Sequence, residues 1–220
     1  MVDGVPNFVS CDTIVHSNRT DGNNLFMASF PSKYQDLFLN SYYDKIIGLC
    51  KRIDVKYGNI CIQMMYVNNK FYILELLHRL DGVGTYKISE ELYHFNALEH
   101  CVDYALGIKN SFIRSKNSKY KVGGILHYWA NPGIVEKIIG VDEINKMEDI
   151  KILDSRYNVG DKIEKTGSML QMAFQVALFA EDKSDLLTKV KKAMSILKIY
   201  DENDNELTDS YIPIDNILNS

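Results

Sequence analysis

The sequence predicts an α+β protein in which a mainly antiparallel sheet carries helices packed on it. Three observations support this class. Two β-rich runs, residues 60–67 and 71–77, are separated by little more than Asn68-Asn69, a turn signal. Strand-like and helix-like segments are grouped along the chain and do not alternate regularly. The 220 residues are 46% hydrophobic and 25% charged, which is enough to bury a sizeable core in one large domain or two small ones.

The first half of the chain is expected to surround a hairpin with helices. In chain order we expect strands at 8–16 and 25–30, a helix at 32–57, the hairpin, a helix at 89–106 and a linker at 111–121. Ser32 is the expected N-cap of the first helix, and Gly107 is the expected stop of the second. The linker is basic and polar, typical of a solvated loop.

The second half is expected to be richer in strands. In order we expect strands at 122–130, 134–139 and 150–155, with a short helix at 141–147. An amphipathic helix follows Ser184, its expected N-cap. Residues 169–180 are strongly apolar, and periodicity alone does not decide between strand and helix. We expect one domain at 1–110 and a second at 111–220 packed on it, or a single continuous domain.

Composition excludes several classes of function. A net charge of −4 gives no general attraction to nucleic acid or to an anionic membrane, so neither is expected as a partner. No apolar run approaches the roughly 20 residues that span a bilayer. The four cysteines, Cys11, Cys50, Cys61 and Cys101, are widely and irregularly spaced, which argues against a zinc site. Free thiols in a reducing cytoplasm are the expected state.

Two charged residues make the hairpin the best place to look for chemistry. Glu75 and Arg79 stand among apolar neighbours at the end of the second strand, and a charge there is costly unless it is paired or binds something. Strand alternation places Glu75 and Arg79 on one face. A two-residue loop at Asn68-Asn69 would put Gln63 on the opposite face, whereas a three-residue loop that includes Val67 would put it on the face of Glu75. We expect the three-residue loop.

The run GNICIQMMYVNNKFYILELLHRLDGVG, residues 58–84, resembles the metal-binding hairpin of ATP-grasp enzymes, particularly the biotin carboxylase and carbamoyl-phosphate synthase branch. The resemblance implies that Gln63 and Glu75 are ligands of Mg2+ (or Mn2+) and that Arg79 serves phosphate or substrate. Two positions depart from the family pattern Glu-x-Asn-Pro-Arg. Leu77 stands where the family has Asn, and His78 stands where it often has Pro. Leucine cannot coordinate a hard cation, so the expected metal site either has fewer protein ligands than usual or is partly degenerate.

The resemblance covers only part of an ATP-grasp enzyme. Residues 33–56 and 90–107 resemble the helices on either side of the hairpin, and residues 123–204 resemble the carboxy-terminal portion of carboxylate-amine ligases. This favours a strand at 169–180. Counterparts of the amino-terminal domain and of the lid that carries the ATP-binding lysine are missing. The expected architecture is therefore a carboxy-terminal part of the ATP-grasp fold, with a chain that is inactive alone.

These observations lead to three hypotheses. Two assign a function on the ATP-grasp scaffold, and the third assigns the chain to an unrelated fold. In the first hypothesis the chain is part of a ligase that activates a small carboxylate with Mg-ATP as an acyl phosphate, for attack by an amine or similar nucleophile. In that reading Arg79 clamps phosphate, and Gly82 and Gly84 let backbone amides approach the substrate. The second is a non-catalytic interaction or assembly module on the same scaffold; a homodimer is among the assemblies that the resemblance allows. The third is an unrelated α+β protein in which Glu75 and Arg79 form a buried ion pair.

Overall fold

The chain divides into two units, each with its own sheet. The structure, a computed structural model, describes residues 1, 4, 6, 8–16, 25–108 and 118–220. One unit combines Met1–Ser10 with Pro31–Ser118, and the other combines Cys11–Phe30 with Lys119–Ser220. The first two strands, which we placed in a domain at 1–110, thus belong to the sheet of the second unit. Most of the expected linker at 111–121 lies outside the described residues.

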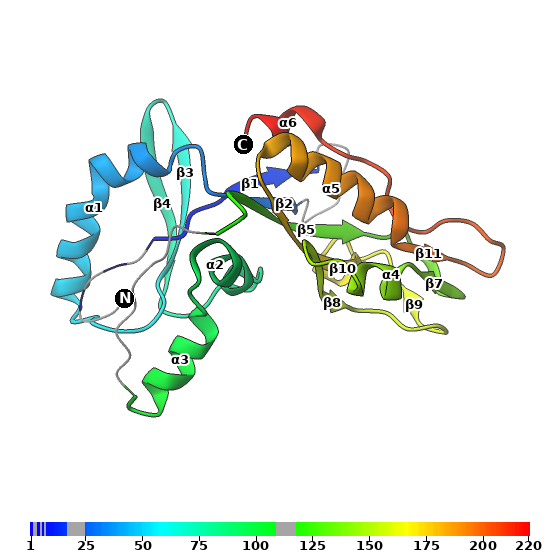
Figure 1. Cartoon of the computed structure of the whole chain (residues 1–220), viewed down its shortest axis with the longest axis horizontal. Helices are drawn as coiled ribbons and strands as arrows, with labels where there is room; N and C mark the ends of the chain where they lie inside the picture. Colours follow the sequence, from blue (N-terminus) through cyan, green and yellow to red (C-terminus); the bar gives the residue numbers. More distant parts are fainter. Residues whose placement is uncertain (2–3, 5, 7, 17–24, 109–117) are drawn as a thin grey trace. The chain divides into compact units, whose positions relative to one another are not determined.

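The second unit is built on a five-stranded, fully antiparallel sheet with strand order β1-β2-β5-β10-β8 (Figure 1). Its strands are β1 (Asp12–Val15), β2 (Leu25–Phe30), β5 (Val122–Trp129), β8 (Ile150–Ser155) and β10 (Met172–Ala180). Every residue of β10 is buried, since it is flanked by strands on both sides and covered on both faces. This accounts for the strongly apolar run and confirms that it is mainly a strand, after one short 3-10 turn, η1 (Met169–Gln171).

Helix α5 (Lys183–Ile196) covers one face of this sheet with the apolar stripe that its sequence predicts. Its N-cap is Asp182, whose side chain accepts a hydrogen bond from the Asp185 amide, so the expected cap at Ser184 is two residues too late. Smaller elements complete the unit: β6 (Gly133–Ile134), β7 (Lys137–Ile139), α4 (Val141–Asn145), β9 (Lys162–Ile163), β11 (Lys198–Tyr200) and α6 (Ile214–Leu218). The strand expected at 134–139 is thus two short ones.

The first unit packs a helix on a two-stranded hairpin. Helix α1 (Gln35–Arg52) lies against β3 (Cys61–Val67) and β4 (Lys70–Leu77) (Figure 1). Phe38 and Tyr42 of α1 both meet the ring of Phe71 edge-on, with ring centroids 5.3 and 5.5 Å apart. The N-cap is Tyr34 without a side-chain cap, and the Ser32 hydroxyl instead accepts from the Tyr34 amide.

The helix expected at 89–106 is two helices. They are α2 (Thr85–Tyr93) and α3 (Ala97–Ala105). His94 takes a left-handed conformation, φ 53°, which ends α2, and the Asn96 side chain then caps α3 by accepting from two backbone amides. Gly107 follows α3 with φ +75°, as expected of a helix stop. None of the described helices is long and apolar enough to cross a bilayer.

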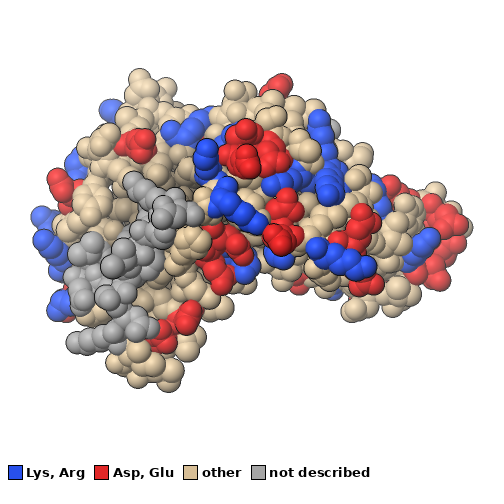
Figure 2. Space-filling view, viewed as in Figure 1, with Lys and Arg blue, Asp and Glu red and all other residues tan. Residues whose placement is uncertain are grey.

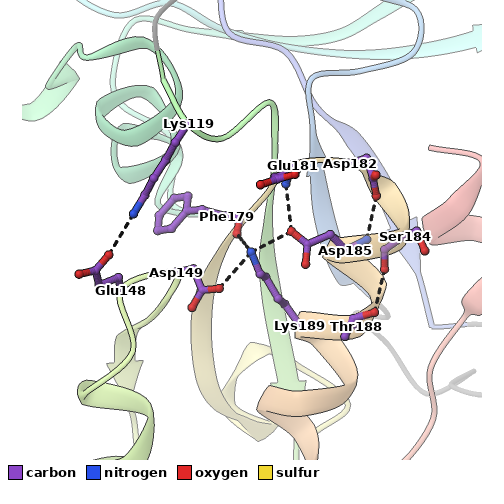
Figure 3. A network of polar contacts seen from close by, with 10 residues as sticks. All are labelled: Lys119, Glu148, Asp149, Phe179, Glu181, Asp182, Ser184, Asp185, Thr188 and Lys189. Atoms are coloured by element: carbon purple, nitrogen blue, oxygen red, sulfur yellow. Dashed lines mark hydrogen bonds and ion pairs between the residues drawn. The ribbon is translucent and has the colours of Figure 1, made fainter.

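Charges of both signs are interspersed on the face of the molecule that Figure 2 draws. One group of them holds the start of α5 in place, and Figure 3 shows its geometry. Lys189 Nζ lies 3.0 Å from Asp149 Oδ2 and 2.9 Å from Asp185 Oδ2, and it donates to the Phe179 carbonyl at 2.6 Å. Burial lowers the pKa of Lys189, but its hydrogen bonds to Asp185 and Asp149 outweigh burial, so the pKa is raised. This lysine ties α5 to β10 and to the residue before β8.

We predict that Lys189→Met destabilises the chain by about 2 kcal/mol, because two partly buried carboxylates and a carbonyl lose their shared donor. Denaturant unfolding followed by circular dichroism measures the change. Lys119→Met is the matched control, since the Lys119–Glu148 pair lies in solvent and its removal should have no measurable effect. Equal losses from the two variants would contradict the assignment.

A buried histidine makes the sheet acid-sensitive. His127 on β5 is fully buried, its Nε2 lies 3.1 Å from Gln175 Nε2 on β10, and its Nδ1 has no partner among the described residues. The amide donates to Nε2, which assigns the ring proton to Nδ1. Burial lowers the pKa of His127 to about 4 from 6.5. The unfolded chain therefore binds a proton more readily than the folded chain between these values. The contribution of neutral His127 to stability is complete above pH 6.5 and is lost as the pH falls toward 4.

We predict that His127→Gln flattens the loss of stability between pH 6.5 and 4, a loss of at most about 3 kcal/mol from this one group. The free energy of unfolding, measured at several pH values, tests this slope. The control is His94→Asn, an exposed position where Asn tolerates the left-handed backbone. An unchanged slope in His127→Gln would show that other groups govern the acid response.

Candidate functional site

The candidate site begins with the turn of the β3–β4 hairpin. Val67 pairs with Lys70, so the loop contains only Asn68 and Asn69, whose φ angles are 50° and 61°. Two successive left-handed residues are typical of a type I′ hairpin turn, which matches the twist of the strands, and Asn tolerates this conformation. The expected three-residue loop is wrong.

A β-bulge nevertheless brings Gln63 and Glu75 to the same face. The register shifts between Gln63 and Met64: Met64 pairs with Ile73, whereas Gln63 pairs with Glu75, so Leu74 is the extra residue. Directly opposed residues of an antiparallel pair share a face. The expectation that Gln63 and Glu75 share a face is therefore confirmed, but by the bulge at Leu74 and not by the length of the loop.

The two faces of the hairpin differ in what covers them. Ile62, Met64 and Phe71 pack on α1. The opposite face, here called the open face, consists of alternating residues from both strands and is largely exposed. Its members are Gln63, Met65, Val67, Lys70, Tyr72 and Glu75. Cys61 and Leu77 form the next, half-buried pair on this face. The metal-ligand candidates therefore lie on the solvent side of the sheet.

The buried ion pair that formed our third hypothesis is absent. Glu75 and Arg79 are both exposed, and within the part of the chain that the structure describes no ion pair joins them. Arg79 Nη1 donates to the Leu80 carbonyl at 2.8 Å. His78, at the position where the resemblance expects proline, lies with Nε2 3.1 Å from the Tyr57 carbonyl oxygen and so joins the base of the hairpin to the preceding loop.

An aspartate that we did not single out shapes the glycine loop. Asp81 Oδ1 accepts hydrogen bonds from the amides of Val83 and Thr85, at 3.0 and 3.3 Å. Gly84 has φ 82° and stands at the start of α2, where a side chain would be strained. Gly82 is exposed, and a Cβ there would meet nothing within 4 Å, so the fold does not require glycine at this position. The signal for Asp81 was available, since Asp before Gly is typical of side-chain-stabilised turns.

Cys61 lies at the half-buried end of the open face, opposite Leu77. Burial raises the pKa of the Cys61 thiol, Asp81 raises it further, Arg79 opposes this, and Glu75 raises it again. The charges of Asp81, Arg79 and Glu75 therefore all act on this one thiol. A raised pKa keeps Cys61 a neutral thiol and not a thiolate nucleophile at neutral pH. The sequence alone did not identify Cys61 because only the strand register shows what it faces.

The donors on the open face suit a hard cation held jointly with phosphate. Gln63 and Glu75 offer an amide oxygen and a carboxylate, the oxygen ligands that Mg2+ prefers. Leu77 adds no ligand, and among the described residues no group of three or more His, Cys, Asp or Glu side chains could hold a metal ion. Mg2+ is commonly bound through one or two protein carboxylates together with phosphates and water, so two donors fit a metal-nucleotide complex better than a bare ion.

No protein-family model matches the chain, and no curated protein matches its sequence. Solved structures do match in fold. Phosphoribosylglycinamide synthetase from Anaerococcus prevotii aligns with a TM-score of 0.70 and 16% identity, over 91% of this chain and 51% of that one. An L-amino acid ligase from Bacillus licheniformis aligns at 0.67 and 16%, over 92% and 53%. Biotin carboxylase from Campylobacter jejuni aligns at 0.62 and 16%, over 89% and 42%.

These similarities show the fold class. The chain has an ATP-grasp fold over about half the length of the enzymes it matches, with a mostly antiparallel sheet and packed helices. At 16% identity the likeness extends to the fold alone. That Gln63, Glu75 and Arg79 line one open cleft is our prediction from the sequence, and the likeness in fold does not test it.

We predict that alkylation of Cys61 at pH 7 to 8 responds in opposite directions to its two charged neighbours. Asp81→Asn should speed the reaction with iodoacetamide about two- to threefold by lowering the thiol pKa, and Arg79→Gln should slow it by a similar factor. Peptide mass spectrometry measures the rate at Cys61, with Cys11, an exposed thiol, as the internal reference. A change in the same direction in both variants would indicate altered access and not altered charge.

Proposed function

We propose that this chain is the metal- and phosphate-binding part of an ATP-grasp ligase that activates a carboxylate with Mg-ATP. One observation carries the proposal: Gln63 and Glu75 are direct cross-strand partners on the open face of the hairpin. The pair supplies two oxygen ligands at adjacent positions, on a rigid element, facing solvent. The fold shared with a synthetase, a ligase and a carboxylase supports the reaction class.

In the proposed reaction a carboxylate oxygen of the substrate attacks the γ-phosphorus of ATP and ADP leaves, giving an acyl phosphate. An amine or similar nucleophile then attacks the acyl carbon, and inorganic phosphate departs. The bound metal would neutralise phosphate oxygens. Glu75 and Gln63 would hold that metal, and Arg79 would hold phosphate or acyl phosphate through its planar guanidinium. The Asp81 carboxylate fixes the loop that follows Arg79 by accepting from the amides of Val83 and Thr85, and Gly82 and Gly84 would let the backbone approach the substrate.

The carboxy-terminal position within a ligase, the small carboxylate substrate and a cytoplasmic location belong to the same proposal. None of the four cysteines, all of which lie among the described residues, forms a disulfide, which fits a reducing compartment. The chain spans about half of the enzymes it matches, so the remaining half of the nucleotide site would come from polypeptide outside the described fold.

A second candidate function is a non-catalytic interaction or assembly module on the same scaffold. Leu77 favours it, because a leucine replaces an oxygen ligand on the face that would bind the metal. The two candidates differ in whether the open face binds a metal-nucleotide complex.

We predict that the chain binds Mn2+-ADP and that Glu75→Gln weakens this binding about tenfold or more, because a charged ligand is lost. Electron paramagnetic resonance of free Mn2+ measures the binding. Arg79→Met should weaken ADP binding with or without the metal, whereas Glu75→Gln should affect only the metal-dependent part. Glu143→Gln, which changes an exposed carboxylate on α4, is the control. No metal-dependent binding, or binding unaffected by Glu75→Gln, favours the assembly module.

The chain alone is expected to turn over ATP negligibly, since half of the enzymes' length has no counterpart in it. ADP production by the purified chain measures this. Robust Mg2+-dependent turnover that Glu75→Ala abolishes would contradict the expectation and would show that the described residues complete the site.

A further inference from the structure

Arg79 lies just beyond the part of the hairpin that the strand ladder holds. The last cross-strand pair of β3 and β4 joins Cys61 to Leu77, and the two residues that follow, His78 and Arg79, form a bend. Backbone outside a ladder is freer to move than paired backbone. A guanidinium that clamps phosphate in a fixed geometry needs a supported backbone. The support of Arg79 must therefore come from contacts other than strand pairing.

The side chain of His78 supplies such a contact on the amino-terminal side of Arg79. Its Nε2 lies 3.1 Å from the carbonyl oxygen of Tyr57, and because a carbonyl only accepts, Nε2 carries the proton and donates. The ring also has a seat at Gly58, which is buried and has φ +94°. A Cβ at Gly58 would lie 2.8 Å from the same nitrogen atom, so the imidazole occupies the space that a larger residue would fill. The position of His78 is thus fixed both by a hydrogen bond and by shape.

The segment that receives this hydrogen bond is itself anchored on helix α3. The side-chain amide of Asn59 donates to the sulfur atom of Cys101 at 2.6 Å. The ring of Tyr57 stacks on the ring of Tyr104, with centroids 5.2 Å apart and planes inclined by 19°. These contacts hold the segment against α3. The hydrogen bond from His78 therefore fixes the start of the bend relative to a helix, which is a rigid support.

The carboxyl side of Arg79 has a comparable support. Two residues later, the Asp81 carboxylate accepts hydrogen bonds from two backbone amides of the loop that leads into α2. Arg79 itself donates from Nη1 to the carbonyl of its neighbour Leu80 at 2.8 Å, and a contact between adjacent residues moves with them. The bend that carries Arg79 is therefore held at both ends by side chains, His78 before it and Asp81 after it.

We propose that His78 is a positioning residue for Arg79: its hydrogen bond to the Tyr57 carbonyl fixes the backbone from which the guanidinium reaches phosphate. The inference rests on the proposed function, in which Arg79 holds phosphate or acyl phosphate. A purely structural His78 would stabilise the hairpin and have no separate effect at Arg79. The two roles differ in whether a change at His78 acts through Arg79, which a double-mutant cycle measures.

Isothermal titration calorimetry of the full chain with metal-free ADP, in the presence of EDTA, tests this coupling. His78→Ala should raise the dissociation constant for ADP about three- to tenfold, the effect of losing one hydrogen bond. In the Arg79→Met background the same change should raise it less than about 1.5-fold, because the side chain that His78 positions is already gone. His78→Gln should bind ADP within about twofold of the unaltered chain, since the amide nitrogen of Gln reaches about as far as Nε2 and donates to the same carbonyl.

His94→Asn is the matched control, because His94 is another exposed histidine of the first unit, at the end of α2. It should leave the affinity for ADP unchanged. A second measurement is independent of nucleotide. The order parameter of the Arg79 backbone amide, measured by NMR relaxation, should fall from about 0.85 toward about 0.6 in His78→Ala and stay near its original value in His78→Gln. The amides of Gln63 and Glu75, which lie in the paired ladder, should keep their order parameters in both variants.

An unchanged order parameter at Arg79 in His78→Ala overturns the inference, regardless of ADP binding. So does an equal loss of ADP affinity in the Arg79→Met background, or a His78→Gln variant that binds ADP as weakly as His78→Ala. A chain that binds no ADP overturns the proposed function and, with it, the role of His78 in binding, even where the order parameter shows that His78 holds the bend. The two failures are thus distinguishable.

Discussion

The extra residue at Leu74 is the constraint on which the proposed metal site depends. A type I′ turn at Asn68-Asn69 fixes the pairing of the outer hairpin, and unbroken pairing from that turn would set Gln63 opposite Leu74. The bulge advances β4 by one residue, so Glu75 arrives opposite Gln63. Because side chains alternate strictly along a strand, a one-residue change decides between two oxygen donors on one face and donors separated by the sheet.

The proposed metal site depends on the exposure of Glu75. Metal binding would require its carboxylate to point at a cation shared with phosphate. Leu77, which offers no ligand, is half-buried as the cross-strand partner of Cys61, whereas Gln63 and Glu75 are exposed.

The five-stranded sheet of the second unit is held together mainly by buried apolar side chains. β10 is covered on both faces, α5 seals one of them, and Lys189 fixes the start of that helix by joining three oxygen atoms from separate segments (Figure 3). His127 and Gln175 are polar residues among the apolar ones of neighbouring strands, and they contact each other. Burial of the imidazole lowers the pKa of His127, because it disfavours the charged form. These polar contacts specify how the strands meet, whereas the apolar run supplies most of the driving force.

Local sequence determined the α+β class, the two hairpin strands and the apolar character of β10, because hydrophobic patterning and turn signals are local properties. It also supplied the proposal of Gln63, Glu75 and Arg79 as site residues. The division of the long helix at His94, the caps at Asp182 and Tyr34, and the membership of β1 and β2 in the sheet of the second unit were decided by tertiary structure. So was the face of Gln63. A bulge leaves no signal in residue type here, because Leu74 is an ordinary strand residue and only pairing across the hairpin shows that it is the extra one.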